Sequence, residues 1–543
     1  MKIYSSERKE IENIYGKVSP FELKDKLISL AEESNKNSTH SLLDAGRGNP
    51  NWIAATPRDA FFTFGHFAVE ESRKEWNDND LAGMPKKQGI FRNFMGFAKN
   101  HHDSPGMELL NKMINYGVTV KGFDADAWVH ELVDGIIGDN YPQPDRMLRH
   151  IESVVNDYLI KELCYNKPLV QKFNLFAVEG ATAGMCYIFD SLIANNILSK
   201  GDKIALMSPI FTPYLEIPHL PRYDFEVVDI LASELSEDGT HTWQYPSEEI
   251  EKLQDASIKA LFIVNPSNPP SVAMNIQTVD MLKEIVNINN PNLMIISDDV
   301  YGTFVDNFHS LMADLPYNTI GVYSFSKYFG VTGWRLGTIA LHEENVFDKL
   351  LKEQNVEKKE RARIRYGALS INPDEILFID RIVADSRQVA LNHTAGLSTP
   401  QQVQMAFFSL FALIDEDDRY KKLTKEICRR RKKLLCDNLG IQLKNDPYDA
   451  AYYTQFDLLE WAKNNYNDEF MNYLKENYKP VDILLKLAEQ SSIVLLSGNG
   501  FHGPEWSIRI SLANLNDESY STIGKVIREI LEEYVTKWKI DNI

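Results

Sequence analysis

The clearest pattern in the chain is a series of short, nearly unbroken apolar segments between residues 170 and 345. A strand that alternates apolar and polar residues has one wet face, whereas these segments have none. Strands of this kind are typical of a parallel sheet that helices cover on both sides. The segments predict strands at 174–178, 203–207, 260–264, 293–297, 319–325 and 336–341. The helical pattern between them, such as residues 185–197, indicates an α/β fold.

The flanking regions follow other patterns. Residues 1–40 are predicted as charged helix, followed by a loop at 44–52 that is rich in Gly, Pro and Asn and resists regular structure. Residues 343–435 are predicted to be mostly helical, with solvated charged faces. The remaining C-terminal part changes to strand, helix, strand, strand, helix, which indicates a smaller α+β layer. Its last helix is expected to begin near Asn516 or Asp517, because both residue types cap helices well.

Composition narrows the class of protein. The chain has 543 residues, of which 44% are hydrophobic and 25% charged, as in ordinary globular proteins. Its net charge of −19 argues against nucleic acid and anionic membranes, but two or three arginines could still hold a small anionic substrate. We expect no membrane span and no signal peptide, because the chain has no long apolar run and its N-terminus has no apolar core. We expect no metal site, because the four cysteines form no CxxC pair. A reducing cytoplasm is the expected compartment.

Polar side chains gather in four loops that follow predicted strands, at residues 179–184, 265–271, 297–301 and 324–335. Ligand sites of parallel sheets lie at these strand ends. Taken singly, each loop has an ordinary structural interpretation: a tight turn, a stiff Asn-Pro turn, a helix cap or a salt-bridged lysine. Their common position at one edge of the sheet favours a shared site.

The residue types in these loops indicate chemistry. The small residues around Thr182 open a helix and expose N–H groups to an anion, and Asn268 could present its amide to a ligand. Asp298 ends an apolar strand, where a carboxylate needs a cation or a donor. Lys327 directly follows another buried strand, and a desolvated lysine becomes nucleophilic as its pKa falls. Arg335 follows two glycines that allow the loop to fold back.

The order and spacing of the four loops resemble the fold type I, class I/II aminotransferase family of pyridoxal-phosphate enzymes, from Arg47 to Arg509. The resemblance implies a large domain with a mostly parallel seven-stranded sheet and a smaller α+β domain. Residues 1–59 would form the N-terminal segment of the small domain and a substrate loop, 60–405 the large domain, and 406–543 the C-terminal small domain. It also implies pyridoxal 5′-phosphate as cofactor and a homo-oligomer, in which dimers with shared active sites assemble to a dodecamer.

Residue roles carry over from the resemblance. Lys327 matches the lysine that binds the cofactor covalently and moves protons, and Asp298, rather than Asp299, matches the acid that pairs with the pyridine nitrogen. Tyr214 is expected near Asp298. The other expected cofactor contacts are Asn268 and Tyr301 on the phenolic oxygen, Gly180, Ala181, Thr182, Ser324 and Arg335 on the phosphate, Phe211 stacked on the ring, and Tyr141 on the phosphate of a neighbouring subunit.

Arg509 matches the arginine that binds the substrate α-carboxylate, for which a planar guanidinium is well suited. Segments 46–52, 83–101 and 392–400 resemble a subgroup of the family that releases the 4-carboxylate of L-aspartate as CO2, gives L-alanine, and also transfers amino groups to α-keto acids. Arg47 is the first candidate for the distal carboxylate and Thr394 the second. A plain aspartate aminotransferase remains the alternative, and a non-catalytic protein that keeps the site is the third possibility.

Overall fold

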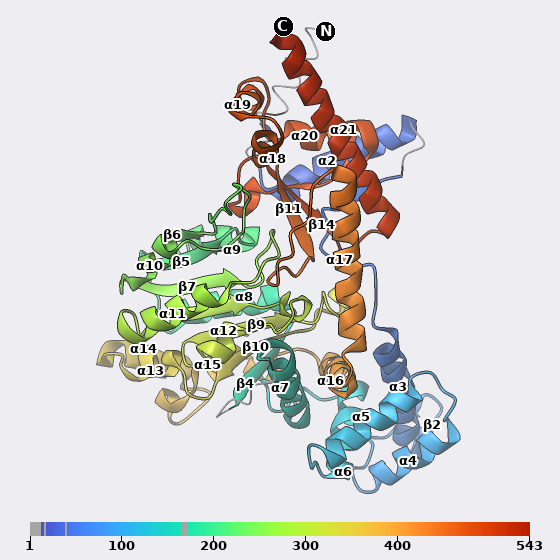
Figure 1. The fold of residues 1–543 in the computed structure, drawn as a ribbon. Coiled ribbons are helices and arrows are strands. Elements are labelled where there is room, and N and C mark those ends of the chain that lie inside the picture. Colours follow the sequence, from blue (N-terminus) through green and yellow to red (C-terminus); the bar gives the residue numbers. More distant parts are fainter. Residues whose placement is uncertain (1–11, 13, 16–17, 38–40, 166–171, 543) are drawn as a thin grey trace.

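The computed structural model describes residues 12, 14–15, 18–37, 41–165 and 172–542. Its centre is a seven-stranded sheet, in which β10 runs antiparallel to its two neighbours and the other strand pairs are parallel. The predicted α/β fold with a mostly parallel sheet is therefore confirmed (Figure 1). In spatial order the strands are β4 (Phe173–Val178), β10 (Gly337–His342), β9 (Thr319–Ser324), β8 (Met294–Asp298), β7 (Ile258–Val264), β5 (Lys203–Ser208) and β6 (Glu226–Leu231).

Both faces of the sheet are buried, which explains the unbroken apolar segments. In β7, Leu261 and Ile263 belong to a core shared with α11 (Ile276–Ile288), whereas Phe262 belongs to the core on the opposite face. The hydrophobic pattern missed β6. This strand lies at the edge of the sheet and most of its side chains are partly exposed, so it lacks the apolar signal.

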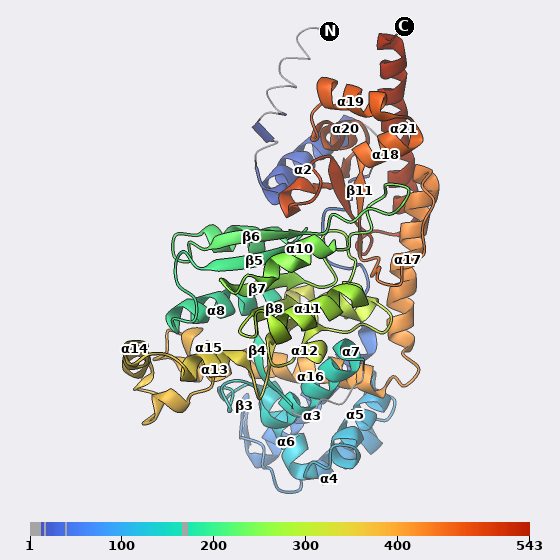
Figure 2. The ribbon, with the colours of Figure 1, turned by 60° about the vertical axis from the view of Figure 1, so that its left-hand side comes forward.

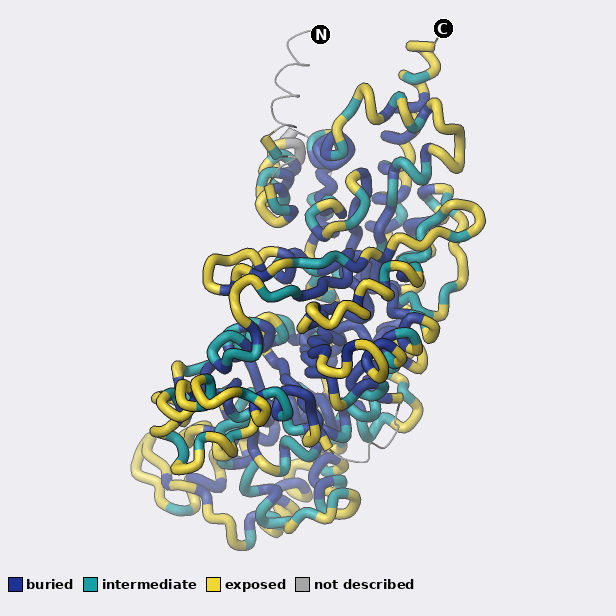
Figure 3. The backbone as a smooth tube through the Cα atoms, turned by 90° about the vertical axis from the view of Figure 1, so that its left-hand side faces the viewer, coloured by how far each residue is buried: buried dark blue, intermediate teal, exposed yellow. Residues whose placement is uncertain are grey.

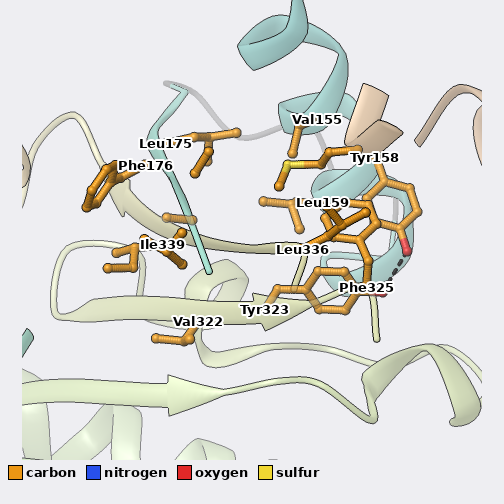
Figure 4. Close-up of a cluster of buried hydrophobic side chains, with 14 of the residues drawn as sticks. Val155, Tyr158, Leu159, Leu175, Phe176, Val322, Tyr323, Phe325, Leu336 and Ile339 are labelled. Atoms are coloured by element: carbon orange, nitrogen blue, oxygen red, sulfur yellow. Dashed lines mark hydrogen bonds between the residues drawn. The ribbon is translucent and has the colours of Figure 1, made fainter. Parts of the chain in front are cut away.

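On one face, α7 (Arg149–Leu163) packs against the antiparallel edge of the sheet. Figure 4 shows Val155 and Leu159 from this helix close to side chains of β4, β9 and β10. The hydroxyls of Tyr158 and Tyr323 lie 2.6 Å apart within this apolar cluster, so each buried phenol has a hydrogen-bonding partner. Close packing of large side chains on both faces holds the strands in place, and with them the strand ends from which the polar loops emerge.

Further helices surround the sheet, and the long helical region predicted near 343–435 is present. Those that pack around it or follow it are α8 (Ala181–Ala194), α9 (Thr212–Glu216), α10 (Ser247–Glu251), α12 (Leu311–Asp314), α13 (Val346–Lys352), α14 (Val356–Tyr366), α15 (Phe378–Asp385) and α16 (Thr399–Ile414). A separate helical unit packs on α16 beside the sheet (Figures 1 and 2). It consists of α3 (Ala55–Glu75), α4 (Ile90–Asn100), α5 (Met107–Thr119) and α6 (Ala125–Ile137), with the short hairpin β2 (Asn77–Asp78) and β3 (Leu81–Ala82).

The smaller α+β layer combines the two ends of the chain. The N-terminal helix α2 (Pro20–Asn37) packs on α20, and β1 (Leu43–Asp44) pairs in parallel with β12. Of the helix predicted over 1–40, residues 1–11 and 38–40 lie outside the described residues. The remaining elements are α17 (Arg419–Leu439), β11 (Tyr453–Asp457), α18 (Leu458–Asn465), α19 (Asp468–Asn477), α20 (Asp482–Ser491), β12 (Ile493–Val494), β13 (Leu496–Ser497), β14 (Ser507–Ser511) and α21 (Asp517–Asp541).

The C-terminal helix begins where its capping residue predicts. The side chain of Asn516 accepts a hydrogen bond from the Ser519 N–H, and α21 starts at Asp517. Helix α21 packs along α17, which runs from the small layer down to the large one (Figures 1 and 2).

The two layers have separate apolar cores. The large layer has a core on each face of the sheet, one of which includes α16, and the core of the small layer lies between α2, α17, α20 and α21. Figure 3 shows the buried segments inside each layer. The predicted boundary between residues 405 and 406 falls within α16, which continues unbroken to Ile414. We therefore propose that the division lies after α16, in the turn at residues 415–418. Among the described residues, no helix is both long and apolar enough to cross a membrane.

Candidate active site

A cavity of about 460 Å³ lies at the carboxyl ends of β7, β8 and β9, between the sheet and the small layer. All four predicted loops contribute to its wall, together with the loop that follows β1 and with β14. The predicted residues that line it are Arg47, Ala181, Thr182, Phe211, Asn268, Asp298, Tyr301, Ser324, Lys327, Arg335 and Arg509. Segments that are hundreds of residues apart in sequence are thus brought to one place.

Asp298 and Asp299 follow each other but face different surroundings, as expected on an extended segment. Asp298 lines the cavity, accepts a 2.7 Å hydrogen bond from the Tyr214 hydroxyl, and accepts another from the Val300 N–H. The predicted proximity of Tyr214 to Asp298 is therefore confirmed. The Asp299 carboxylate instead accepts hydrogen bonds from the hydroxyls of Ser297 and Ser310.

Burial sets the proton affinity of both carboxyls. It raises the pKa of Asp298 to about 6, although the Tyr214 hydroxyl, the Val300 N–H and the Lys327 charge act in the opposite direction. Burial likewise raises the pKa of Asp299 to about 7, against the two serine donors. A carboxyl in such surroundings gains most from a cationic partner, and only Asp298 of this pair lines the cavity where a ligand could provide one.

One end of the cavity is built for an anion. Gly180 caps the N-terminus of α8 with φ of 87°, a conformation that favours glycine. A Cβ atom at this position would lie 2.4 Å from Nη2 of Arg335, so the guanidinium packs directly over the turn. Arg335 donates to the carbonyls of Thr332 and Glu179, which fixes its orientation. Helix N–H groups and a fixed cation together form a phosphate-type site.

The Ser324 hydroxyl lies beside this turn and donates to the Ser326 hydroxyl at 2.8 Å. Both serines line the cavity, as does Lys327, which follows them in the same loop. The order Ser-Phe-Ser-Lys directly after β9 thus places two small donors and an amine at the strand end. Ser326 lies within the predicted loop 324–335 but is not among the predicted site residues.

At the opposite side, Arg509 lies on β14 and is 2% exposed. Its Nη1 donates to the Asn268 side-chain oxygen at 3.2 Å, and its Nη2 donates to the Gly46 carbonyl at 2.7 Å. Its Nε has no hydrogen-bonding partner within the described residues. A buried guanidinium that keeps an unused donor and faces a cavity can bind a carboxylate, because an unpaired buried N–H costs free energy.

Arg47 occupies the same cavity in a different setting. Its Nε donates to the Asp44 carboxylate at 2.9 Å, and 60% of its side chain is exposed. Asp44 also pairs with Lys24 of α2 at 3.4 Å, and Lys24 lines the cavity as well. Arg47 is thus a solvent-facing cation on a loop, and its charge is already partly balanced by Asp44.

Three predicted residues, Tyr141, Thr394 and Gly180, do not line the cavity of their own chain. Tyr141 is 66% exposed, and its ring contacts the His393 ring edge-on, with a centroid distance of 5.5 Å. Thr394 follows His393 directly and donates its hydroxyl to the Leu391 carbonyl. Gly180 also does not line the cavity, but it supports Arg335 from behind. Tyr141 and Thr394 therefore lie close to each other but outside the cavity lining of this chain.

Several cavity residues had no signal in the sequence. Tyr453, the first residue of β11, places its hydroxyl 3.0 Å from that of Tyr301. Gly48 lies next to it, because a Cβ there would approach the Tyr453 hydroxyl to 2.4 Å and Lys327 Nζ to 3.2 Å. Phe21 and Lys24 of α2 also line the cavity. These residues come from three distant segments that meet only through tertiary packing, so local sequence patterns could not have indicated that they share a cavity.

Comparison with known proteins agrees with this geometry. Residues 164–527 match the family model for aminotransferase class I and II. The chain belongs to this aminotransferase family. It is also 46% identical over 524 residues to a Pseudomonas sp. protein named bifunctional aspartate aminotransferase and L-aspartate beta-decarboxylase, and the match covers 96% of this chain and 97% of that protein.

Solved structures place the fold in the same aminotransferase group. A double mutant of Thermus thermophilus aspartate aminotransferase superimposes with a TM-score of 0.57 at 14% identity, and covers 93% of this chain and 96% of that one. An aromatic aminotransferase from Pyrococcus horikoshii gives a TM-score of 0.55 at 16% identity, with 93% and 99% covered. At such identities the likeness shows the fold alone.

Proposed function

We propose that this chain removes the 4-carboxylate of L-aspartate as CO2 to give L-alanine, with an accompanying aspartate aminotransferase activity. The single observation that carries the proposal is the identity of 46% over nearly the full length of a relative with both activities in its name. The candidate active site agrees with it, because two arginines, one buried and one exposed, face the cavity from the substrate side.

The donor set fits pyridoxal 5′-phosphate. The turn at Gly180 with Arg335 suits a phosphate, and the buried Asp298 suits a protonated pyridine nitrogen. Phe211 supplies a flat apolar surface for the ring, and Lys327 Nζ reaches the cavity between the two ends. We propose Asn268 and Tyr301 as the residues that contact the phenolic oxygen. When bound, this cofactor supplies an electron sink for the negative charge that develops on the substrate.

The residues of the chain divide the remaining work. Arg509 holds the α-carboxylate of aspartate, and its contacts with Asn268 and Gly46 keep the guanidinium in place. Lys327 Nζ takes the proton from the substrate Cα and returns one to Cα after CO2 has left, which is general acid–base catalysis by a positioned amine. The Cβ atom takes up one proton in place of the CO2, so that aspartate and one proton give alanine and CO2. Asp298, held by Tyr214, keeps a negative charge in the cavity wall for the pyridine nitrogen.

The two arginines also explain which carboxylate leaves. A carboxylate held by a buried cation is stabilised as an anion, and this opposes its loss as neutral CO2. Arg509 is buried, whereas Arg47 is exposed and already paired with Asp44. The 4-carboxylate beside Arg47 is therefore held less firmly than the 1-carboxylate beside Arg509. We propose that this difference directs decarboxylation to C4.

We also propose that the chain works as a homo-oligomer in which Tyr141 reaches the phosphate of a neighbouring subunit. The support is its position, because Tyr141 is exposed beside His393 and does not line the cavity of its own chain. Mixing inactive Tyr141→Ala and Lys327→Ala variants should restore part of the activity, since some hybrid dimers carry one intact site. Hybrids that are verified by mass and show no recovery would contradict shared sites.

The function is tested by incubating the purified protein with L-aspartate and pyridoxal 5′-phosphate in the absence of any α-keto acid. We expect sustained formation of CO2 and alanine in equal amounts, and its loss in Lys327→Ala. A plain aminotransferase would consume at most one equivalent of aspartate per site under these conditions and would need an α-keto acid to continue. This outcome would replace the proposal by the alternative.

A further inference from the structure

Tyr453 is a cavity residue that none of the four strand-end loops contains. It is the first residue of β11, pairs in register with Ser511 of β14, and is 2% exposed. Its hydroxyl lies 3.0 Å from the hydroxyl of Tyr301, within hydrogen-bonding distance. The contact joins the small layer, which carries Tyr453, to the strand-end loop of the large layer, which carries Tyr301.

The surroundings of Tyr453 fix its ring and its hydroxyl. The Arg509 guanidinium lies over the ring, with 4.4 Å from its central carbon to the ring centroid. The space beside the hydroxyl is kept open by Gly48, where a Cβ would lie 2.4 Å from the Tyr453 oxygen and 3.2 Å from Lys327 Nζ. The phenol and the lysine amine therefore flank the same small volume. Tyr453 thus contacts Arg509 on the substrate side through its ring, and Tyr301 on the cofactor side through its hydroxyl.

Two hydroxyls in contact share a single hydrogen bond, to which only one of them donates. In the proposed function, Tyr301 donates its own proton to the phenolic oxygen of the cofactor. The proton between the two phenols must then come from Tyr453. The geometry points to Tyr453 as a positioning residue that donates to Tyr301 and so commits the Tyr301 proton to the cofactor, an inference that rests on the proposed function.

This arrangement has a measurable consequence for the bound cofactor. A hydroxyl that accepts one hydrogen bond becomes a stronger donor in the next, because the two bonds polarise each other. A stronger Tyr301 donor stabilises the negative charge on the phenolic oxygen, so the proton held between the cofactor and Lys327 is released at a lower pH. Removal of the Tyr453 hydroxyl should therefore raise the apparent pKa of the cofactor absorbance.

The experiment is a spectrophotometric pH titration of the holoenzyme in the visible range, free of substrate. Wild type is compared with Tyr453→Phe, Tyr301→Phe, the double variant, and Tyr452→Phe. Tyr452 is the matched control, since it is the preceding buried tyrosine and donates its hydroxyl to the Gly48 carbonyl at 2.8 Å rather than to Tyr301. We expect Tyr453→Phe to raise the apparent pKa by about 0.3–1 unit and Tyr452→Phe to leave it within error.

The double variant decides whether Tyr453 acts through Tyr301. If it does, Tyr453→Phe adds nothing once the Tyr301 hydroxyl is gone, so the double variant titrates like Tyr301→Phe. An equal shift in both backgrounds, an equal shift in Tyr452→Phe, or no shift in Tyr453→Phe would each overturn the inference. A wild type that binds no pyridoxal 5′-phosphate would overturn the proposed function itself, whereas a titrating wild-type band with an unmoved Tyr453→Phe overturns only the role of Tyr453.

Discussion

The two sides of the cavity differ in how deeply their functional side chains are buried and in how firmly these are held. On the sheet side, Asp298 is the last residue of the buried strand β8, and Lys327 lies three residues after the end of the buried strand β9. Asp298 is held by two hydrogen bonds. On the loop side, Arg47 lies in an irregular segment with most of its side chain in solvent. The sheet side has the rigidity that proton transfer and charge stabilisation require, whereas the loop side can adjust to a substrate. We infer that the chemistry common to the family lies in the sheet side and the choice of reaction in the loop side.

The largest effect is expected when the two neighbouring acids of the sheet side, Asp298 and Asp299, are each replaced by asparagine. Asp298→Asn should lower kcat by about 10²–10³-fold with little change in Tm, because this carboxylate faces the cavity. Asp299→Asn should instead lower Tm, because it weakens the contacts with Ser297 and Ser310, and should keep most of kcat. Steady-state kinetics and thermal unfolding of both variants check this. A larger kcat loss in Asp299→Asn would mean that the two carboxylates are wrongly assigned.

A substitution at Arg509 tests whether a buried arginine contributes more to substrate binding than the exposed Arg47. Arg509→Lys keeps the charge but loses the planar fork and the contacts with Asn268 and Gly46. Losing one charge-assisted contact costs about 1.5–3 kcal/mol, so KM for L-aspartate should rise by roughly 10- to 150-fold. The absorbance of the bound cofactor in the absence of substrate serves as the control and should remain. A variant with wild-type KM would remove Arg509 from the substrate site.

Arg47 is the corresponding test on the loop side. Because this side chain is exposed and paired with Asp44, Arg47→Ala should raise KM by only about 2- to 10-fold. The ratio of alanine to oxaloacetate should fall, because the loosened loop admits the water that leads to the keto acid. Both products are measured by chromatography after incubation with L-aspartate and an α-keto acid. Unchanged KM and product ratio would exclude Arg47, and Thr394 would be tested next.

The smallest expected effect concerns the ion pair between His502 of the small layer and Asp229 of β6 in the large layer. The Asp229 carboxylate raises the pKa of His502, and His502 in turn lowers the pKa of Asp229. The His502 contribution to stability is present below its unfolded pKa of about 6.5 and is lost as the pH rises through its higher folded value. The Asp229 contribution is present above its unfolded pKa of about 3.9 and is lost as the pH falls through its lower folded value.

The contact should therefore stabilise the fold most between about pH 4 and 6.5. His502→Gln should lower Tm slightly at pH 6 and leave it unchanged at pH 9, as followed by thermal unfolding across that range. An equal loss of Tm at both pH values would show that the imidazole acts through packing rather than through its charge.

The sequence predicted the sheet side better than the loop side for a physical reason. A buried strand followed by Asp298 or Lys327 is a local pattern, so both the strand and the functional residue can be identified from a few neighbouring positions. The meeting of Gly48, Tyr301 and Tyr453 depends on how the small layer packs on the large one, and no local pattern encodes it. The edge strand β6 was missed because partial exposure removes the apolar run.

The site residues outside the cavity follow the same logic. The family resemblance indicated Tyr141 for a neighbouring subunit and left open where Thr394 acts, and a single chain places both on its surface near His393. What such residues contact depends on a second copy, which neither periodicity nor motif spacing in one chain can specify.

The central claim is that L-aspartate loses the 4-carboxylate, which lies beside the exposed Arg47, and keeps the 1-carboxylate, which the buried Arg509 binds. Two samples of L-aspartate, one labelled with ¹³C at C1 and one at C4, should be converted by the purified holoenzyme, and the label followed in CO2 and alanine. We predict that all labelled CO2 comes from C4 and that the C1 label stays in alanine. Labelled CO2 from C1, or no CO2 from either sample while amino transfer proceeds, would contradict the account.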